Sequence, residues 1–235
     1  MSKFHLTKLG NGLDEITMKE LIAALPNHDM QFYFSQKSDL YTDQDFIYTL
    51  RSCEEIAGMI VLTPCVTKNA YSCLFIKTLF VAEAYRKGLA SHQLICRSFS
   101  DYYNLVGVFP DMIGMKTFNP TTYVMMRKLS VVTWKESLLY PDIDNKLFDD
   151  SILETIKDFA SIIDCKNPFD DSSGVIRGGG GMISKAFWPD IPICNDVVVN
   201  DYFKKNVLDY DRLFCVVNCS QVRAKRQIMK NLRIK

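Results

Sequence analysis

Three apolar runs joined by short polar turns constrain the fold of this 235-residue chain more than any other feature. The runs cover residues 45–52, 56–63 and 70–81, and they are rich in β-branched and aromatic side chains. Such runs with short connections predict an antiparallel sheet. After the third run the apolar spacing lengthens to about 3.6 residues, which predicts a helix. The residues on that spacing are Leu94, Ile95, Phe99, Tyr102 and Val106.

The segments on either side continue this alternation of strands and helices. Phe4 and Leu6 alternate with polar neighbours as in a strand, and a helical spacing that begins at Met18 ends before Pro26. Farther along, Asn119 is placed to cap a helix that has Pro120 at its first position. The remaining predictions are strands over residues 111–118, 131–139 and 213–219, helices over 152–163 and in the tail, and a flexible glycine-rich loop over 172–181.

Charge is balanced over the whole chain but not along it. Lys and Arg number 28 and Asp and Glu number 27, and the net charge of +1 argues against a dedicated nucleic-acid binder. Residues 141–171 hold nine acids and three bases, whereas residues 221–235 hold six bases and no acid. The basic tail therefore either pairs with the acidic segment, stays solvated, or binds RNA, an acidic membrane surface or an acidic protein.

The eight cysteines form no C-x-x-C pair, and the chain has only three histidines. This usage predicts no metal site and favours buried, reduced thiols, with a disulfide scaffold as the alternative. No apolar run approaches the roughly 18 residues of a membrane span, and residues 1–12 contain no apolar signal core. We therefore expect a cytoplasmic protein without a membrane partner.

Residues 79–94 carry the pattern that predicts chemistry. A buried strand ends near Val81, a short polar loop follows, and the helix begins around Gly88. A tight glycine-containing turn from strand to helix directs free backbone N–H groups at an anion, and Arg86 and Lys87 add positive charge there. Plain loops also have this pattern, so it needs support from elsewhere in the chain.

That support comes from a second motif. The segment resembles the GNAT superfamily of N-acetyltransferases, in which a Q/R-x-x-G-x-G/A loop after the fourth strand binds the pyrophosphate of acyl-coenzyme A. Residues 85–90 lie on that loop pattern. The segment NPTTYVMMRKLSV is similar to the family's helix motif N-P-x-A-x-x-x-Y-x-K-L-G-F, and the resemblance covers residues 46–134. The matching positions of the helix motif are Asn119, Pro120, Lys128 and Leu129.

The resemblance implies an α/β (α+β mixed) architecture, the GNAT fold. This fold has a mostly antiparallel twisted sheet, splayed parallel fourth and fifth strands, and helices on both faces, here with a C-terminal insertion. It also implies acetyl-CoA as co-substrate, bound by strand backbone and loop without a metal, with a strand N–H near Phe80 or Val81 polarising the thioester. The implied binding residues are Leu79, Phe80, Val81, Arg86, Lys87, Gly88, Leu89, Ala90, Ser91 and Asn119.

Three positions depart from the family pattern. Tyr85 stands at the leading Q/R of the loop, and Ser130-Val131 replaces Gly-Phe. Met126 stands where the family has the tyrosine that protonates the coenzyme thiolate. Tyr123 lies one helical turn away and is the candidate catalytic acid, with core packing as the alternative. No general base is evident, and the acids nearest the fourth strand are Glu54, Glu55 and Glu83.

The expected function is acetyl transfer from acetyl-CoA to a primary amine of a cationic small molecule or protein, because the acidic segment favours cations. We expect a core over residues 1–140, an acidic, partly helical insertion over 141–210, and a last core strand with a basic tail over 211–235, all in one domain. Two alternatives stay open: a GNAT-fold binding or regulatory module without chemistry, and an RNA- or translation-linked acetyltransferase. The expected partners are acyl-CoA and the amine, and a homodimer stays open.

Overall fold

A computed structural model describes residues 4–9, 15–24, 42–86, 89–130, 139–143, 150–179, 194–220 and 222–234 of the chain. The chain divides into two compact units. The first contains Met1–Pro64, Ile76–Phe109 and Leu232–Lys235, and the second contains Cys65–Phe75 and Pro110–Asn231.

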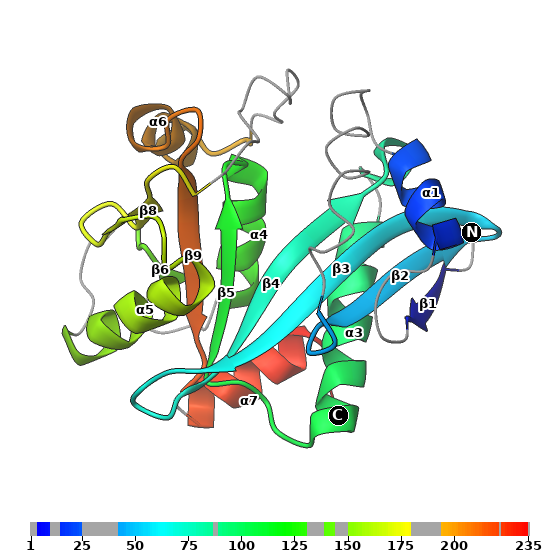
Figure 1. The fold of residues 1–235 in the computed structure, drawn as a ribbon, viewed down its shortest axis with the longest axis horizontal. Coiled ribbons are helices and arrows are strands. Elements are labelled where there is room, and N and C mark those ends of the chain that lie inside the picture. Colours follow the sequence, from blue (N-terminus) through cyan, green and yellow to red (C-terminus); the bar gives the residue numbers. More distant parts are fainter. Residues whose placement is uncertain are drawn as a thin grey trace. The chain divides into compact units, whose positions relative to one another are not determined.

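The first unit is built on the predicted meander. Its strands are β1 (Phe4–Lys8), β2 (Phe46–Ser52), most of β3 (Glu55–Val66) and the later part of β4 (Ser72–Val81). β1 pairs antiparallel with β2, and β2 pairs antiparallel with β3. The helices α1 (Glu15–Ala23) and α3 (Ala90–Val106) lie on opposite faces of these strands (Figure 1). The short 3-10 helix η2 (Glu83–Tyr85) follows β4.

The core of the first unit covers both faces of its strands. Tyr48, Leu50 and Ile60 are fully buried on one face, and Ile47, Thr49 and Val61 are fully buried on the other, because successive side chains of a strand point to opposite faces. Phe46 meets Tyr102 of α3 edge to face, with ring centroids 5.0 Å apart. α3 ends at Gly107, which takes the left-handed conformation (φ 74°) that favours glycine at this position.

The second unit is arranged around β9 (Arg212–Asn218), all of whose residues are buried. β5 (Met112–Thr117) pairs antiparallel with β9 along one edge. β6 (Leu139–Tyr140) and β8 (Val175–Ile176) share the other edge, and β7 (Phe169–Asp170) pairs with β8. The helices of this unit are α4 (Pro120–Ser130), α5 (Asp150–Ile163), α6 (Val197–Asn206) and α7 (Val222–Asn231).

Aromatic packing seats α5 on this part of the sheet. Phe159 of α5 meets Phe214 of β9 edge to face, with ring centroids 5.2 Å apart. Both rings lie against Gly114 of β5, where a Cβ would come within 2.6 Å of the Phe159 ring. In Figure 1, α5 lies in front of β5 and β9, and α4 lies behind them.

Strand order confirms the expected fold class. The order is β1-β2-β3-β4-β5-β9-β8-β7, with β6 also on β9. β4 and β5 are the parallel pair in this mixed sheet, and they meet where both begin. There Ser72 N–H donates to Asp111 Oδ2 (3.0 Å), and Asp111 N–H donates to Ser72 O (2.7 Å). The predicted helices over residues 152–163 and in the tail are also confirmed.

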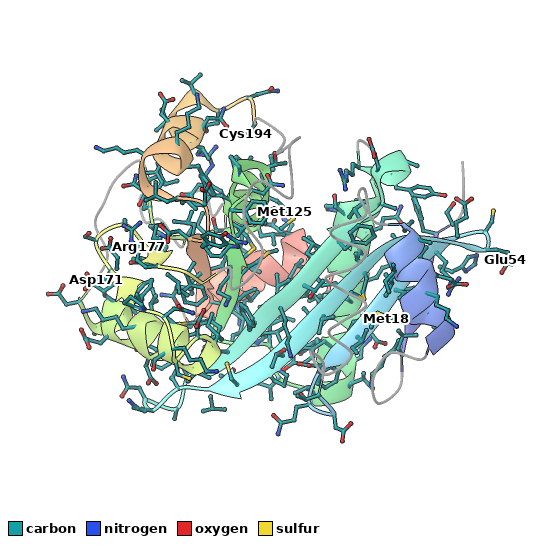
Figure 2. The ribbon with its side chains drawn as sticks, turned by 45° about the horizontal axis from the view of Figure 1, so that its top comes forward. Met18, Glu54, Met125, Asp171, Arg177 and Cys194 are labelled. Carbon is teal, nitrogen blue, oxygen red and sulfur yellow. The ribbon has the colours of Figure 1, made fainter. Side chains whose placement is uncertain are left out.

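The predicted flexible loop over residues 172–181 is wrong in its described part, residues 172–179. Val175 pairs with Leu213 inside the sheet, and Arg177 donates to two carboxylates (Figure 2). Composition pointed to a loop because the ordering contacts come from distant residues. The strand predicted over residues 131–139 lies outside the described residues except for Leu139. No helix in the described ranges has the length and apolarity needed to cross a bilayer.

Candidate functional site

β4 contains one residue more than the stretch of β3 with which it pairs. At the hairpin turn Thr67 N–H donates to Tyr71 O (3.1 Å), and at the far end Ala82 N–H donates to Ala57 O (3.0 Å). From Ala57 to Thr67 is a step of ten residues, whereas from Tyr71 to Ala82 is a step of eleven. An extra residue in one strand is a β-bulge, and its backbone groups are left out of the ladder. The bulged strand contains Leu79, Phe80 and Val81 of the predicted site.

Gly58 on β3 lets this part of β4 pass close by. A Cβ at Gly58 would lie 2.7 Å from Phe80 O and 3.1 Å from Leu94 Cδ2 of α3. Any larger residue would therefore push β4 or α3 away. Gly58 is not among the predicted site residues, although an isolated glycine inside a strand pattern is the sequence signal for a bulge or a close backbone approach.

The connection from β4 to α3 is short and hydrogen-bonded. Tyr85 N–H donates to Ala82 O (2.9 Å), and Arg86 N–H donates to Glu83 O (3.2 Å). Arg86 Nε also donates to Val81 O (3.1 Å), so its side chain folds back over the end of β4. Tyr85, at the leading position of the loop pattern, donates its hydroxyl to Glu55 Oε2 (2.9 Å).

α3 begins without a capping side chain. Its N-cap residue is Leu89, whose side chain has no group to accept a hydrogen bond, and none of the described side chains caps the helix. The first N–H groups of a helix have no partner within the helix, and the helix dipole makes this end positive. Ala90 is buried, Ser91 is half-buried and Leu89 is exposed. Lys87 and Gly88 lie outside the described residues.

A buried ion pair lies on the same sheet. Lys77 Nζ of β4 is 2.9 Å from Asp45 Oδ2, and the Asp45 side chain has no exposed surface. Burial acts to raise the pKa of Asp45, but hydrogen bonds from Thr63, Lys77 and the Thr42 backbone hold it below its usual value. Asp45 is therefore a poor proton acceptor and fixes the Lys77 ammonium on β4. No sequence motif links these residues, which are 32 positions apart.

The acids nearest the fourth strand in the sequence lie at the surface. Glu54 projects from the β2–β3 turn, away from the strands (Figure 2). Glu55 and Glu83 are also exposed, and Glu55 accepts the Tyr85 hydroxyl. None of these three carboxylates is buried.

The second unit contains the other two predicted site residues. Asn119 Oδ1 accepts from Thr121 N–H (2.9 Å), so Asn119 caps α4 as its sequence position predicts. Tyr123 is 1% exposed, and its hydroxyl donates to Pro141 O (2.9 Å) and accepts from Ile143 N–H (3.4 Å). Burial raises the pKa of Tyr123. This position fits the core-packing alternative, and Met126 is fully buried beside it in α4.

Ion pairs occupy much of the charge of the acidic segment. Asp158 pairs with Lys68 (3.3 Å), Asp164 with Lys116 (2.9 Å) and Asp170 with Arg177 (2.8 Å). Lys157 pairs with both Glu154 and Asp171. In the basic tail, Lys225 pairs with Asp111 (3.1 Å), which lies outside residues 141–171.

No family model and no curated protein matches the sequence. Solved structures do match. One is an acetyltransferase from Bacillus subtilis in complex with CoA, at 13% identity and a TM-score of 0.39, covering 92% of this chain and 99% of that one. Another is a GNAT-family acetyltransferase from Staphylococcus aureus Mu50, at 17% identity and a TM-score of 0.34, covering 49% of this chain and 74% of that one. A conserved protein of unknown function from Enterococcus faecalis V583 matches at 15% identity and a TM-score of 0.37. That match covers 54% of this chain and 32% of the other.

The chain has the GNAT fold. It shows this in its strand order, in its parallel β4–β5 pair and in the bulged β4 that precedes η2 and α3.

Proposed function

We propose that the protein is an acyl-CoA-dependent N-acyltransferase that transfers an acetyl group to a primary amine. The observation that carries the proposal is the β4–α3 connection, where a bulged strand is followed, after the short helix η2, by a helix whose N-cap residue Leu89 has no capping side chain. A pyrophosphate at this end of α3 meets backbone N–H donors and the positive end of the helix dipole. Arg86 supplies a cation to the same place.

The chemistry then needs little from side chains. The amine nitrogen forms a bond to the thioester carbon and the carbon–sulfur bond breaks. The sulfur leaves as a thiolate, and the nitrogen loses one proton to water or to that thiolate. In this proposal a backbone N–H that the bulge leaves out of the ladder donates to the developing oxyanion of the thioester oxygen. Holding a neutral amine beside the thioester can lower the barrier by about 7 kcal/mol or more.

The charge of the acidic segment bears on the choice of acceptor. The sequence predicts a cationic amine from the acids of residues 141–171. The ion pairs of Asp158, Asp164 and Asp170 reduce the charge that this segment presents to a cation. A panel of acceptors should therefore contain polyamines, aminoglycosides, lysine peptides and neutral primary amines.

A non-catalytic module that binds acyl-CoA is the second candidate function. The observation that favours it is Tyr123, whose hydroxyl proton is donated to Pro141 O. A phenol held in this way, with its pKa raised by burial, is poorly placed to protonate a thiolate. This candidate and the enzyme share the donor site and differ in turnover.

The donor site is tested first by placing a charge at the start of α3. Ser91→Asp puts a carboxylate in the first helical turn, where it suits the helix dipole but repels phosphate. We expect the Kd for acetyl-CoA, measured by calorimetry, to rise more than tenfold while the thermal stability is kept. Ser91→Asn is the matched neutral control, with an expected Kd within about threefold of the parent protein. Equal affinities of the two variants would contradict the donor site.

Turnover is then followed by the loss of thioester absorbance. This signal avoids thiol reagents, which would also react with the exposed Cys53 and Cys165. Acetyl-CoA loss that depends on an amine, with the acetylated amine identified by mass spectrometry, supports the enzyme. Acetyl-CoA binding without turnover on any amine of the panel favours the binding module.

A further inference from the structure

The hairpin between β3 and β4 brings two cysteines face to face. Thr67 N–H donates to Tyr71 O, and Tyr71 N–H donates to Thr67 Oγ1, both at 3.1 Å. Thr67 and Tyr71 are therefore opposite each other. Two residues farther along each strand, Cys65 faces Cys73 on the same side of the sheet, because side chains alternate with a period of two. The pKa values of the two thiols shift in opposite directions, each through a hydrogen bond with the other, which agrees with this placement.

This register suits a disulfide. Directly opposed residues of an antiparallel pair have Cα atoms about 4.5–5.5 Å apart, and a disulfide needs about 4.4–6.8 Å. The strands therefore need no large movement to form the bond. Cys65 and Cys73 continue the hydrogen-bonded position of Thr67 and Tyr71, which is the wider of the two spacings. That spacing of about 5.5 Å lies within the range that a disulfide adopts.

The two thiols are not equivalent. Cys65 is half-buried near the exposed tip residue Val66, whereas Cys73 is 2% exposed. A hydrogen bond from Cys73 lowers the pKa of Cys65, although burial and the Asp158 carboxylate act in the opposite direction. The same bond, together with burial, raises the pKa of Cys73. Cys65 is thus the better nucleophile and the more accessible thiol, and Cys73 is placed to resolve it.

We propose that Cys65 and Cys73 are a reversible dithiol–disulfide site that hydroperoxides oxidise. The Cys65 thiolate attacks the peroxide, so that a sulfur–oxygen bond forms, the oxygen–oxygen bond breaks and hydroxide leaves. Cys73 then attacks the Cys65 sulfenic acid sulfur, the sulfur–sulfur bond forms, and water leaves with the Cys73 proton. Two thiols lose two electrons in total, and hydrogen peroxide is reduced to two waters. A dithiol reductant reverses the step by thiol–disulfide exchange.

The site lies where β4 joins β5. Ser72, next to Cys73, exchanges backbone hydrogen bonds with Asp111 at the start of β5. Cys73 belongs to the hydrophobic core of the second unit with Phe159 and Ile156, and Cys65 packs against it. The disulfide would therefore link β3 to β4 close to the hairpin turn, at the end of β4 that packs against this core. The inference is independent of the proposed acyltransferase function.

Peptide mapping of the full-length protein with Cys53→Ser tests the proposal. Trypsin cleaves after Arg51, Lys68 and Lys77, which places Cys65 alone in peptide 52–68 and Cys73 alone in peptide 69–77. After hydrogen peroxide treatment and blocking of free thiols with an alkylating reagent, we expect these two peptides to be linked and to separate on reduction with dithiothreitol. In the Cys73→Ala variant we expect Cys65 to be oxidised further to sulfinic acid, because no thiol is left to react with the sulfenic acid.

The exposed Cys165 serves as an internal reference for the peroxide dose. A dose that oxidises Cys165 while Cys65 and Cys73 both remain reduced would overturn the proposal. So would a Cys65 linked to another cysteine, or a Cys65 sulfinic acid beside a free Cys73 in the Cys53→Ser protein.

Discussion

Two segments of the chain join an arginine to glycine, and the structure uses the two arginines differently. Residues 86–88 precede α3, and residues 177–179 follow β8. Arg177 donates to the Asp170 and Asp211 carboxylates, each at 2.8 Å, and to Asn206 O at 2.9 Å. Arg86 Nε donates to the Val81 carbonyl, which carries no formal charge.

The difference lies in what surrounds each cation. The carboxylates of Asp170 and Asp211 neutralise the charge of Arg177 within the second unit. These ion pairs connect β7 and β8 to the segment before β9. Arg86 donates to the backbone of Val81 at the end of β4, a short distance along the chain from the start of α3, whose N-cap residue Leu89 has no capping side chain. Similar sequence patterns thus give two different results. Arg177 forms a structural clasp with Asp170 and Asp211, and Arg86 belongs to a candidate anion site.

Removing the clasp is expected to have the largest effect. Arg177→Met leaves Asp170 and the mostly buried Asp211 without their cation. We expect the free energy of unfolding, measured by urea denaturation, to fall by about 2–3 kcal/mol, with the exposure of Arg177 limiting the loss. Arg177→Lys should recover part of it, because charge without the planar fork bonds only one carboxylate well. A free energy of unfolding within about 0.5 kcal/mol of the parent is the effect of a neutral surface substitution. That result would show that the ion pairs of Arg177 do not stabilise the fold.

Acid should weaken the ion pairs of Arg177 by protonating their carboxylates. Burial acts to raise the pKa of Asp211, but hydrogen bonds from Gly178 N–H, Arg177 and Leu208 N–H hold it below its usual value. A lowered folded-state pKa stabilises the fold above the unfolded pKa of about 4 and loses this contribution as the pH falls through the folded value. We expect Asp211→Asn to cost about 1–2 kcal/mol at pH 7 and less below pH 4. Parallel stability–pH curves for the two proteins would contradict this.

Removing the other arginine should change binding and leave stability alone. We expect Arg86→Met to weaken acetyl-CoA binding about tenfold in calorimetry, the loss of one charge-assisted contact to phosphate, with unfolding changed by less than about 0.5 kcal/mol. Tyr85→Phe is the matched control, because it removes the bond to Glu55 and keeps the ring contact with Phe4. An unchanged Kd for acetyl-CoA in Arg86→Met would show that Arg86, like Arg177, has no part in binding the coenzyme.

Local sequence patterns predicted the first unit and the helices well. The meander, α3, α4 and the capping Asn119 follow from period, β-branching and capping chemistry over short stretches. The same rules misjudged residues 172–179, because Arg177 is ordered by Asp211, which lies 34 positions away. The pairing of Asp45 with Lys77 escaped prediction for the same reason, since it spans 32 positions.

The sequence by itself determined which stretches become strands and helices and where β4 passes into α3, because these depend on interactions between near neighbours. Only the tertiary structure decided the extra residue in β4, the confinement of Tyr123 to the core, and the contact between Cys65 and Cys73. Each of these depends on strand register or on burial, and both are set by contacts between distant segments. The local pattern thus gives the outline of the donor site, while packing decides which of its side chains are available for chemistry.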